Sequence, residues 1–321
     1  MAANGIKPFA PKPPNMTPID PVTPEDVRPA IRDLLAEHAD QILKIREGIE
    51  TNPLYDPKLH DDLWMLRFWL SHKDSSSKPA KALKSAIDAA AETMEFRKKY
   101  KLDDADVRRS LWPEWDGPDG QIHPKEFRRF LSYVEKYGVM HTQLHPDRGL
   151  VSFIRLASMD NETKLAETTE EEELMATILY SEWRFQVLDE VTRRTGRLTK
   201  HAMFIDLGGV GLKHMNRKNS ERDSKFSKIT ENVYPQANGG FFLLNLSKVI
   251  TVFLRLVRPL YPKRFMEKMD VIITESDVNR IYPRFAEVST IPERFRGTHP
   301  SWPPPETGIK FVEENYQSVT G

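Results

Sequence analysis

The residue with the widest chemical range in this sequence is His201, which begins a short apolar run at residues 201–205. Alternation along a strand would place His201, Met203 and Ile205 on one face of a sheet. An imidazole at that position can donate one hydrogen bond to a bound ligand, or ligate the iron of a haem. A core histidine bonded to the backbone is the simpler interpretation, so the sequence leaves the role of His201 open.

Two other patterns resemble metal sites. His141 and His145 have the four-residue spacing of helical zinc ligands, but no Glu lies between them and Pro146 follows. We therefore expect solvated histidines beside a loop. Residues 119–127 copy the second half of a calcium-binding loop, but the first two ligand positions of that loop lack side-chain oxygens. The sequence predicts no metal site at either place.

No pattern in the chain predicts bond-making chemistry. Residues 208–211 are glycine-rich and follow a predicted strand, but they lack the spacing and the lysine of a phosphate-binding loop. The chain has no G-x-S-x-G elbow, no H-E-x-x-H motif and no compelling carboxylate pair. It contains no cysteine, which excludes disulfides and thiolate catalysis. We expect a protein that is not an enzyme and needs no cofactor.

Composition narrows the possible partners and compartments. Lys and Arg number 47, equal to Asp and Glu at 47, so no overall field attracts nucleic acid or an anionic membrane. Residues 1–21 lack the apolar core of a signal peptide. The most apolar stretch, residues 241–257, is interrupted by charges and is too short to span a bilayer. We expect a cytoplasmic monomer that binds no nucleic acid.

The 321 residues suit one large domain with an appended helical part. Prolines crowd residues 1–24, which we expect to form a flexible, extended tail. Helices are predicted over residues 24–49, 62–70 and 80–100. The expected division is a tail with one helix (1–58), a helical part (59–124), the main domain (125–300) and a C-terminal tail (301–321).

Short apolar runs alternate with helical segments in the main domain. The predicted strands are residues 150–154, 202–205, 241–245 and 271–273. Between them, helices are predicted from Thr168 or Thr169 to about Arg194, within residues 217–233, and over residues 247–257. Strands separated by helices indicate an α/β fold with a mostly parallel sheet.

The order of these segments resembles the CRAL-TRIO family, whose best-known fungal member is a phosphatidylinositol/phosphatidylcholine transfer protein. The likeness covers roughly residues 60–300, and its matching segments come in the family's order and at nearly its spacing. These segments are residues 66–68, 95–100, 205–209, 234–235, 239, 241–245 and 258–262.

The resemblance implies a curved, mostly parallel sheet flanked by helices, with an N-terminal helical subdomain. One face of the sheet would form an apolar pocket, and the helix at 247–257 would act as its gate. The pocket positions carried over from the family are His201, Met203, Ile205, Phe241, Leu243, Ile250, Leu254 and Val257. The positions of the gate that would face a membrane are Phe253, Arg255, Arg258, Lys263 and Arg264.

The head-group positions depart from the family pattern. Members that bind phosphatidylinositol carry an acid and an arginine where this chain has Gln236 and Ala237. Lys73 matches a phosphate-contacting lysine of the family. Lys268, with a shift of one residue, is the nearest match to the lysine that pairs with that acid, and both could still meet an anionic phosphate. The salt bridge of the inositol pocket therefore looks lost. The hydroxyls of members that bind phosphatidylcholine are absent at His201 and Met203.

Together these observations predict a lipid carrier that encloses one phospholipid or similar molecule and exchanges it at a membrane surface. Two alternatives stay open. In the first, the ligand is another apolar molecule, such as a sterol, a tocopherol-like compound, a retinoid or haem. In the second, the chain is an interaction module with a collapsed pocket.

Overall fold

The computed structural model describes residues 7–108, 140–211, 214, 216–261 and 266–299. For Val249, Phe253, Val257 and Arg258 it describes the backbone alone. The predicted tail at residues 301–321 and the calcium-loop lookalike at 119–127 lie outside the described residues.

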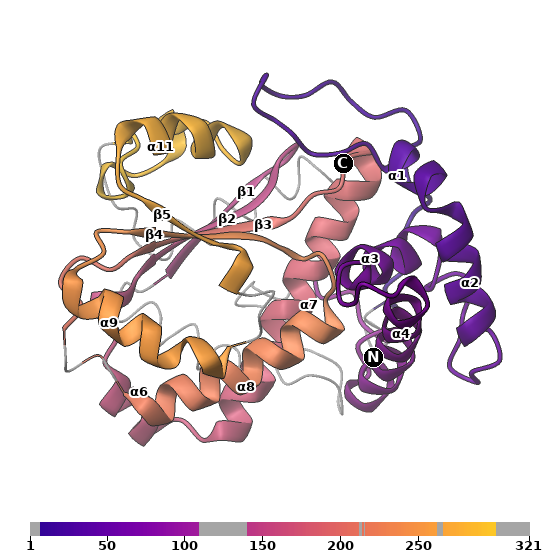
Figure 1. Cartoon of the computed structure of the whole chain (residues 1–321), viewed down its shortest axis with the longest axis horizontal. Helices are drawn as coiled ribbons and strands as arrows, with labels where there is room; N and C mark the ends of the chain where they lie inside the picture. Colours follow the sequence, from indigo (N-terminus) through magenta and orange to yellow (C-terminus); the bar gives the residue numbers. More distant parts are fainter. Residues whose placement is uncertain (1–6, 109–139, 212–213, 215, 262–265, 300–321) are drawn as a thin grey trace, which may run out of the picture.

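A helical part precedes the sheet, as predicted. It consists of α1 (Ile31–Glu37), α2 (Ala39–Ile49), α3 (Asp62–His72) and α4 (Pro79–Tyr100). Asp61 caps α3 by accepting a hydrogen bond from the Trp64 backbone at 3.0 Å. The helix α3 is buried on nearly all sides, and α4 packs beside it through small residues such as Ala82 and Ala86. These helices lie at one end of the sheet (Figure 1).

The described strands form one five-stranded sheet in the order β1-β2-β3-β4-β5. Strands β2 (Gly149–Arg155), β3 (His201–Asp206), β4 (Asn238–Leu244) and β5 (Met269–Ile272) are parallel, as predicted. The edge strand β1 (Met140–His145) is antiparallel to β2 and was not predicted. It contains both His141 and His145, so the prediction of solvated histidines beside a loop was wrong. His141 is buried, because β1 is covered on the side facing the C-terminal segment.

Helices cover both faces of the sheet. After β2 come η1 (Leu156–Ser158), α6 (Asn161–Glu167) and α7 (Glu170–Thr195). The helices α8 (Arg217–Val233) and α9 (Lys248–Val257) lie on one side of the sheet, and α11 (Glu275–Ile281) lies on the other (Figure 1). The short turns η3 (Arg258–Leu260), η4 (Tyr282–Arg284), η5 (Val288–Thr290) and η6 (Glu293–Phe295) complete the described elements.

Local sequence explains where α7 begins and ends. Thr169 accepts a hydrogen bond from the Glu172 backbone, and the Glu172 side chain accepts one from the Thr169 backbone, which completes a capping box. At the other end Gly196 adopts φ 64°, a left-handed conformation that ends the helix. A β-carbon at Gly196 would lie 2.6 Å from the backbone oxygen of Asn15.

The proline-rich N-terminal segment is docked along the domain, so the prediction of a flexible tail over residues 1–24 was wrong for residues 7–24. Its backbone is held by Asn15, whose N–H donates to the Arg193 carbonyl at 2.7 Å, and by Ile19, whose N–H donates to the Thr195 carbonyl at 2.9 Å. Phe9 is buried. Proline has no backbone N–H group to donate, but the residues between the prolines do. Here their N–H groups donate hydrogen bonds to carbonyls at the end of α7. We call residues 7–29 the strap.

The face of the sheet toward α11 is a solid core. Phe153, Phe204 and Phe242 stand side by side on β2, β3 and β4, with ring centroids 5.7 Å and 5.0 Å apart. They pack against Tyr282, Phe295 and the other buried residues of the segment from α11 to η6. We call this the outer face, and the opposite one, toward α8 and α9, the inner face.

Candidate functional site

The inner face carries the residues predicted to line a pocket. Register places Met203 beside Phe241, and Ile205 beside Leu243. On strand β5, Met269 is paired with Phe241, and Val271 is paired with Leu243. Alternation therefore works as predicted: Met203 and Ile205 share one face of β3, while Phe204 points into the outer core.

The inner face is less completely filled than the outer face. Met203 and Ile205 on the central strand β3 are only partly buried, as are Met269 and Val271 on the edge strand β5, whereas Phe241 and Leu243 on β4 between them are buried. On the outer face the corresponding side chains of β2, β3 and β4 are all buried. Interior side chains normally pack without gaps, so residual accessibility in the middle of a covered sheet indicates unfilled space. The partial exposure of Met203 and Ile205 therefore distinguishes the inner face from the outer face.

Helix α9 lies over the apolar end of this face. Ile250 is buried and Leu254 partly buried, and both belong to the hydrophobic cluster that contains Ile205 and Leu243. Four of the predicted pocket residues are thus brought together. Further cluster members that the sequence reasoning missed are Leu156, Leu207, Val210, Leu246, Met269 and Val271. The partial exposure of most of them could not be read from sequence.

The outward side of α9 is also apolar. Val252 is 56% exposed and Leu256 is 72% exposed, and the two residues are one helical turn apart. Lys248 and Arg255 are exposed beside them. The helix α9 is thus amphipathic: Ile250 and Leu254 face the sheet, while its outward side combines two cations with two exposed apolar side chains.

The gate residues predicted from the family are only partly described. Arg255 is exposed, as expected of a gate cation. Lys263 and Arg264 lie outside the described residues, as do the side chains of Phe253, Val257 and Arg258. Their roles therefore stay predictions.

His201 lies at the other end of the inner face, where the parallel strands begin. It is buried, and both ring nitrogens are engaged: Nδ1 lies 3.1 Å from Nη1 of Arg184, and Nε2 lies 2.8 Å from Oγ of Ser152. A guanidinium only donates, so Nδ1 accepts and the ring proton resides on Nε2, which donates to Ser152. Burial holds the pKa of His201 well below its usual range, and Arg184 lowers it further.

The simplest interpretation of the sequence was a core histidine bonded to the backbone, but both partners of His201 are side chains. It also leaves neither ring nitrogen free to ligate an iron. The sequence singled out His201 but not its partners, Arg184 on α7 and Ser152 on β2. No short motif connects these three residues, which come together only through the register of β2 and β3.

Lys268 forms an ion pair, but with an acid at another place in the chain than the family's position after the Tyr-Pro pair. Its Nζ lies 2.7 Å from Oε2 of Glu231, which stands on α8, before the Tyr-Pro pair. Glu231 also accepts a hydrogen bond from Nδ2 of Asn238 at 2.8 Å. Sequence reasoning sought the acid after the Tyr-Pro pair and therefore missed Glu231.

The two other predicted head-group residues lie near α3. The side-chain amide of Gln236 donates to Oγ of Ser71 at 3.0 Å. Ser71 precedes Lys73 by two residues, and Lys73 is exposed at the end of α3. Gln236 itself adopts φ 62° in the turn before β4. It is thus a structural contact between the turn and the helical part.

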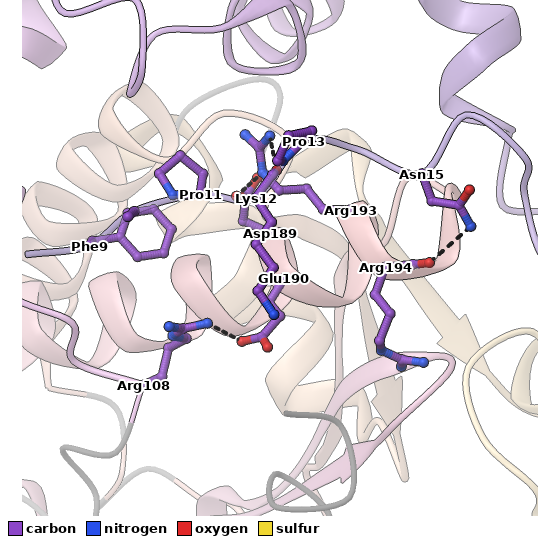
Figure 2. A pocket seen from close by; sticks show the side chains of 11 residues that line it. Phe9, Pro11, Lys12, Pro13, Asn15, Arg108, Asp189, Glu190, Arg193 and Arg194 are labelled. Carbon is purple, nitrogen blue, oxygen red and sulfur yellow. Dashed lines mark hydrogen bonds and ion pairs between the residues drawn. The ribbon is translucent and has the colours of Figure 1, made fainter. Parts of the chain in front are cut away.

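A separate cavity of about 300 Å³ lies between the strap and the last turns of α7 (Figure 2). Its lining includes Phe9 and Pro11 from the strap, and Arg193 from α7. Arg193 donates to the Lys12 carbonyl at 2.9 Å and forms ion pairs with Asp61 and Asp189. These polar contacts hold the strap in place, and the cavity contains none of the predicted pocket residues.

Among the described residues, no group of three or more His, Asp or Glu side chains is arranged to hold a metal ion. Within the same ranges, no helix has the length and apolar character needed to cross a membrane.

Comparisons with known proteins complete the description of the site. A family model described as CRAL/TRIO domain matches residues 135–297, just over half of the chain. Among solved structures, the chain is similar to the "Crystal structure of Sfh5", with a TM-score of 0.45 and 10% sequence identity. That alignment covers 90% of this chain and 97% of the other. No curated protein sequence matches the chain.

Proposed function

Because the chain belongs to the CRAL/TRIO domain family, we propose that it is a carrier that encloses one phospholipid or similar hydrophobic molecule on the inner face. CRAL-TRIO proteins are generally lipid-binding carriers rather than enzymes. The observation that carries the proposal is the contrast between the two faces of the sheet. The side chains of the outer face on β2, β3 and β4 are buried, whereas Met203 and Ile205 on the inner face of the central strand keep accessible surface.

The proposed mechanism is physical rather than chemical. Each buried CH₂ group contributes about 0.8 kcal/mol, so a lipid that moves from a bilayer into an equally dry pocket loses little free energy. The pocket then replaces the bilayer as solvent for the acyl chains, and transfer needs only an opening.

We propose that α9 covers the pocket and that its movement provides this opening. Its inward side chains, Ile250 and Leu254, would cover the bound lipid, while its outward side chains, Val252 and Leu256, would enter the membrane interface. Lys248 and Arg255 would add about 1 kcal/mol each near an anionic surface. Membrane contact of this kind is transient, because a single short helix supplies it.

A transfer assay tests this function. The full chain is mixed with donor vesicles that contain a self-quenched fluorescent phospholipid and with unlabelled acceptor vesicles. We expect dequenching that rises in proportion to protein concentration. Dequenching no faster than in vesicles alone, with anionic and with neutral acceptors, would refute phospholipid transfer.

A further inference from the structure

Two threonine–proline pairs stand in the strap, Thr17-Pro18 and Thr23-Pro24. Both threonines keep accessible surface, and each proline disfavours a helical backbone in the threonine before it. A threonine directly before a proline is the substrate pattern of proline-directed protein kinases. The two threonines have different surroundings, and those of Thr23 include a partner for a phosphate group.

Thr23 holds the strap against the segment that follows α11. Its Oγ1 donates to the Pro283 carbonyl, which belongs to η4, at 3.0 Å. The same carbonyl accepts a second hydrogen bond from Nη1 of Arg148, at 3.3 Å. Arg148 stands in the turn between β1 and β2. One backbone oxygen thus brings the Thr23 hydroxyl and the Arg148 guanidinium side by side.

Among the described residues, Arg148 is a buried cation that forms no ion pair. It is 5% exposed, and its Nη2 is buried without a hydrogen-bond partner. Three acids interact with it at longer range: Asp26, which forms its ion pair with Arg28, and the exposed Glu25 and Glu287. Leaving a buried charged donor unpaired is costly, so this guanidinium favours an anionic acceptor.

We propose that Thr23 is a phosphorylation site and that Arg148 binds its phosphate. The enzyme implied is a proline-directed kinase, which transfers the terminal phosphoryl group of ATP to Oγ1 of Thr23. The Oγ1–P bond forms, the bond between that phosphorus and the bridging oxygen of ADP breaks, and the hydroxyl proton passes to the catalytic base of the kinase. The product carries nearly two negative charges and three strong acceptor oxygens.

Phosphorylation changes how the strap is held. The Thr23 hydroxyl can no longer donate to the Pro283 carbonyl, but a phosphate oxygen accepts from Nη2 of Arg148. A neutral hydrogen bond is thereby replaced by a charge-assisted one, which is roughly twice as strong. The neighbouring Asp26 carboxylate opposes this little, because Arg28 already compensates its charge. The phosphorylated strap is therefore docked more firmly than the unmodified one.

Thr17 provides a comparison within the same chain. Its side chain is exposed, and its backbone N–H donates to Oδ1 of Asn15 at 2.9 Å. No arginine in the described part of the chain forms a hydrogen bond with its hydroxyl. A phosphate on Thr17 therefore stays solvated, and it reports how a phosphothreonine of this strap behaves without a guanidinium partner.

Phosphorus NMR of the doubly phosphorylated chain tests the proposal. The full wild-type chain is treated with a proline-directed kinase and ATP, mass spectrometry identifies the modified residues, and Thr17→Ala assigns the two resonances. A guanidinium stabilises the dianion, so we expect the phosphate on Thr23 to titrate at a lower pH than the phosphate on Thr17. This difference should vanish in Arg148→Gln. It should persist in the matched control Arg217→Gln, an exposed arginine on α8.

Hydrogen exchange measures how firmly the strap is docked. The backbone N–H of Ile19 donates to the Thr195 carbonyl, and it exchanges when the strap detaches. We expect phosphorylation of Thr17→Ala, which modifies Thr23 alone, to slow this exchange about tenfold, since a hydrogen bond to a charged group is gained. Phosphorylation of Thr23→Ala, which modifies Thr17 alone, should leave the exchange rate unchanged.

Several results would overturn the proposal. They are a chain in which the kinase leaves Thr23 unmodified, equal titration of the two phosphates in the wild type, and a difference that survives in a folded Arg148→Gln variant. Unchanged or faster exchange of Ile19 after modification of Thr23 would also overturn it. Thermal melts show whether each variant is folded, and if Arg148→Gln is not, the wild-type comparison of the two phosphates decides.

Discussion

The outward side chains of α9 give a prediction whose size follows from their exposure. Fully burying a Val or Leu side chain contributes about 1.5–3 kcal/mol. Val252 is 56% exposed and Leu256 is 72% exposed, so insertion of both into a membrane gains roughly 3 kcal/mol in total. The double variant Val252→Ser/Leu256→Ser should therefore bind vesicles about a hundredfold more weakly.

The chain offers a matched control for this variant. Val27, in the strap, is 63% exposed, and Leu43 is 50% exposed on α2, a helix at the opposite end of the molecule from α9 (Figure 1). The variant Val27→Ser/Leu43→Ser removes the same two residue types. Both double variants should keep the free energy of unfolding within about 1 kcal/mol of wild type, because all four side chains are exposed.

Vesicle co-sedimentation over a range of lipid concentrations measures the partition coefficient of each variant. We expect a large loss for the α9 variant and a small one for the control. Equal losses in the two variants would refute the assignment of α9 as the membrane-facing element, and so would no loss in either.

Three further predictions concern stability and the pocket. Burial lowers the pKa values of His141 and His145 from 6.5 to about 4, so the unfolded chain binds more protons than the folded chain between these two pH values. The free energy of unfolding, measured by denaturant titration, should therefore fall by up to about 2 kcal/mol per histidine from pH 7 to pH 5. A free energy of unfolding that does not change over this range would contradict the prediction. Gly196→Ala should destabilise the fold by more than about 1 kcal/mol and speed proteolysis within the strap, because its β-carbon would meet the Asn15 carbonyl; unchanged cleavage would contradict the docking. Ile205→Trp should reduce ligand uptake while keeping the melting temperature near the wild-type value, and an unaffected uptake would show that the inner face is not the binding site.

The sequence was sufficient for the fold and the family. Apolar runs of strand length between helical segments predicted β2, β3, β4 and β5, and the ordered motifs indicated the family that the match over residues 135–297 supports. It failed for β1 because residues 140–145 alternate polar and apolar types too weakly to stand out. It failed for the strap because proline-rich composition predicts an extended backbone but cannot show that Arg193 and Gly196 hold it.

The site was predictable only in part. Alternation and family position found Ile205, Leu243, Ile250 and Leu254, which meet in one cluster. Room for a ligand depends on how completely these side chains fill the space between sheet and helix, and an apolar pattern is the same for a pocket and for a solid core. The polar cluster around Arg184 joins side chains from α7, β2 and β3, and such long-range contacts leave no local pattern.

The central claim is that the inner face encloses one long apolar molecule, and identification of that molecule tests it most directly. The full chain is purified, incubated with mixed natural lipids, separated from vesicles and extracted with organic solvent for mass spectrometry. We predict a single class of long-chain lipid at about one molecule per chain, and a much lower yield from Ile205→Trp. A wild-type chain that emerges empty, and stays empty after incubation, would contradict the account.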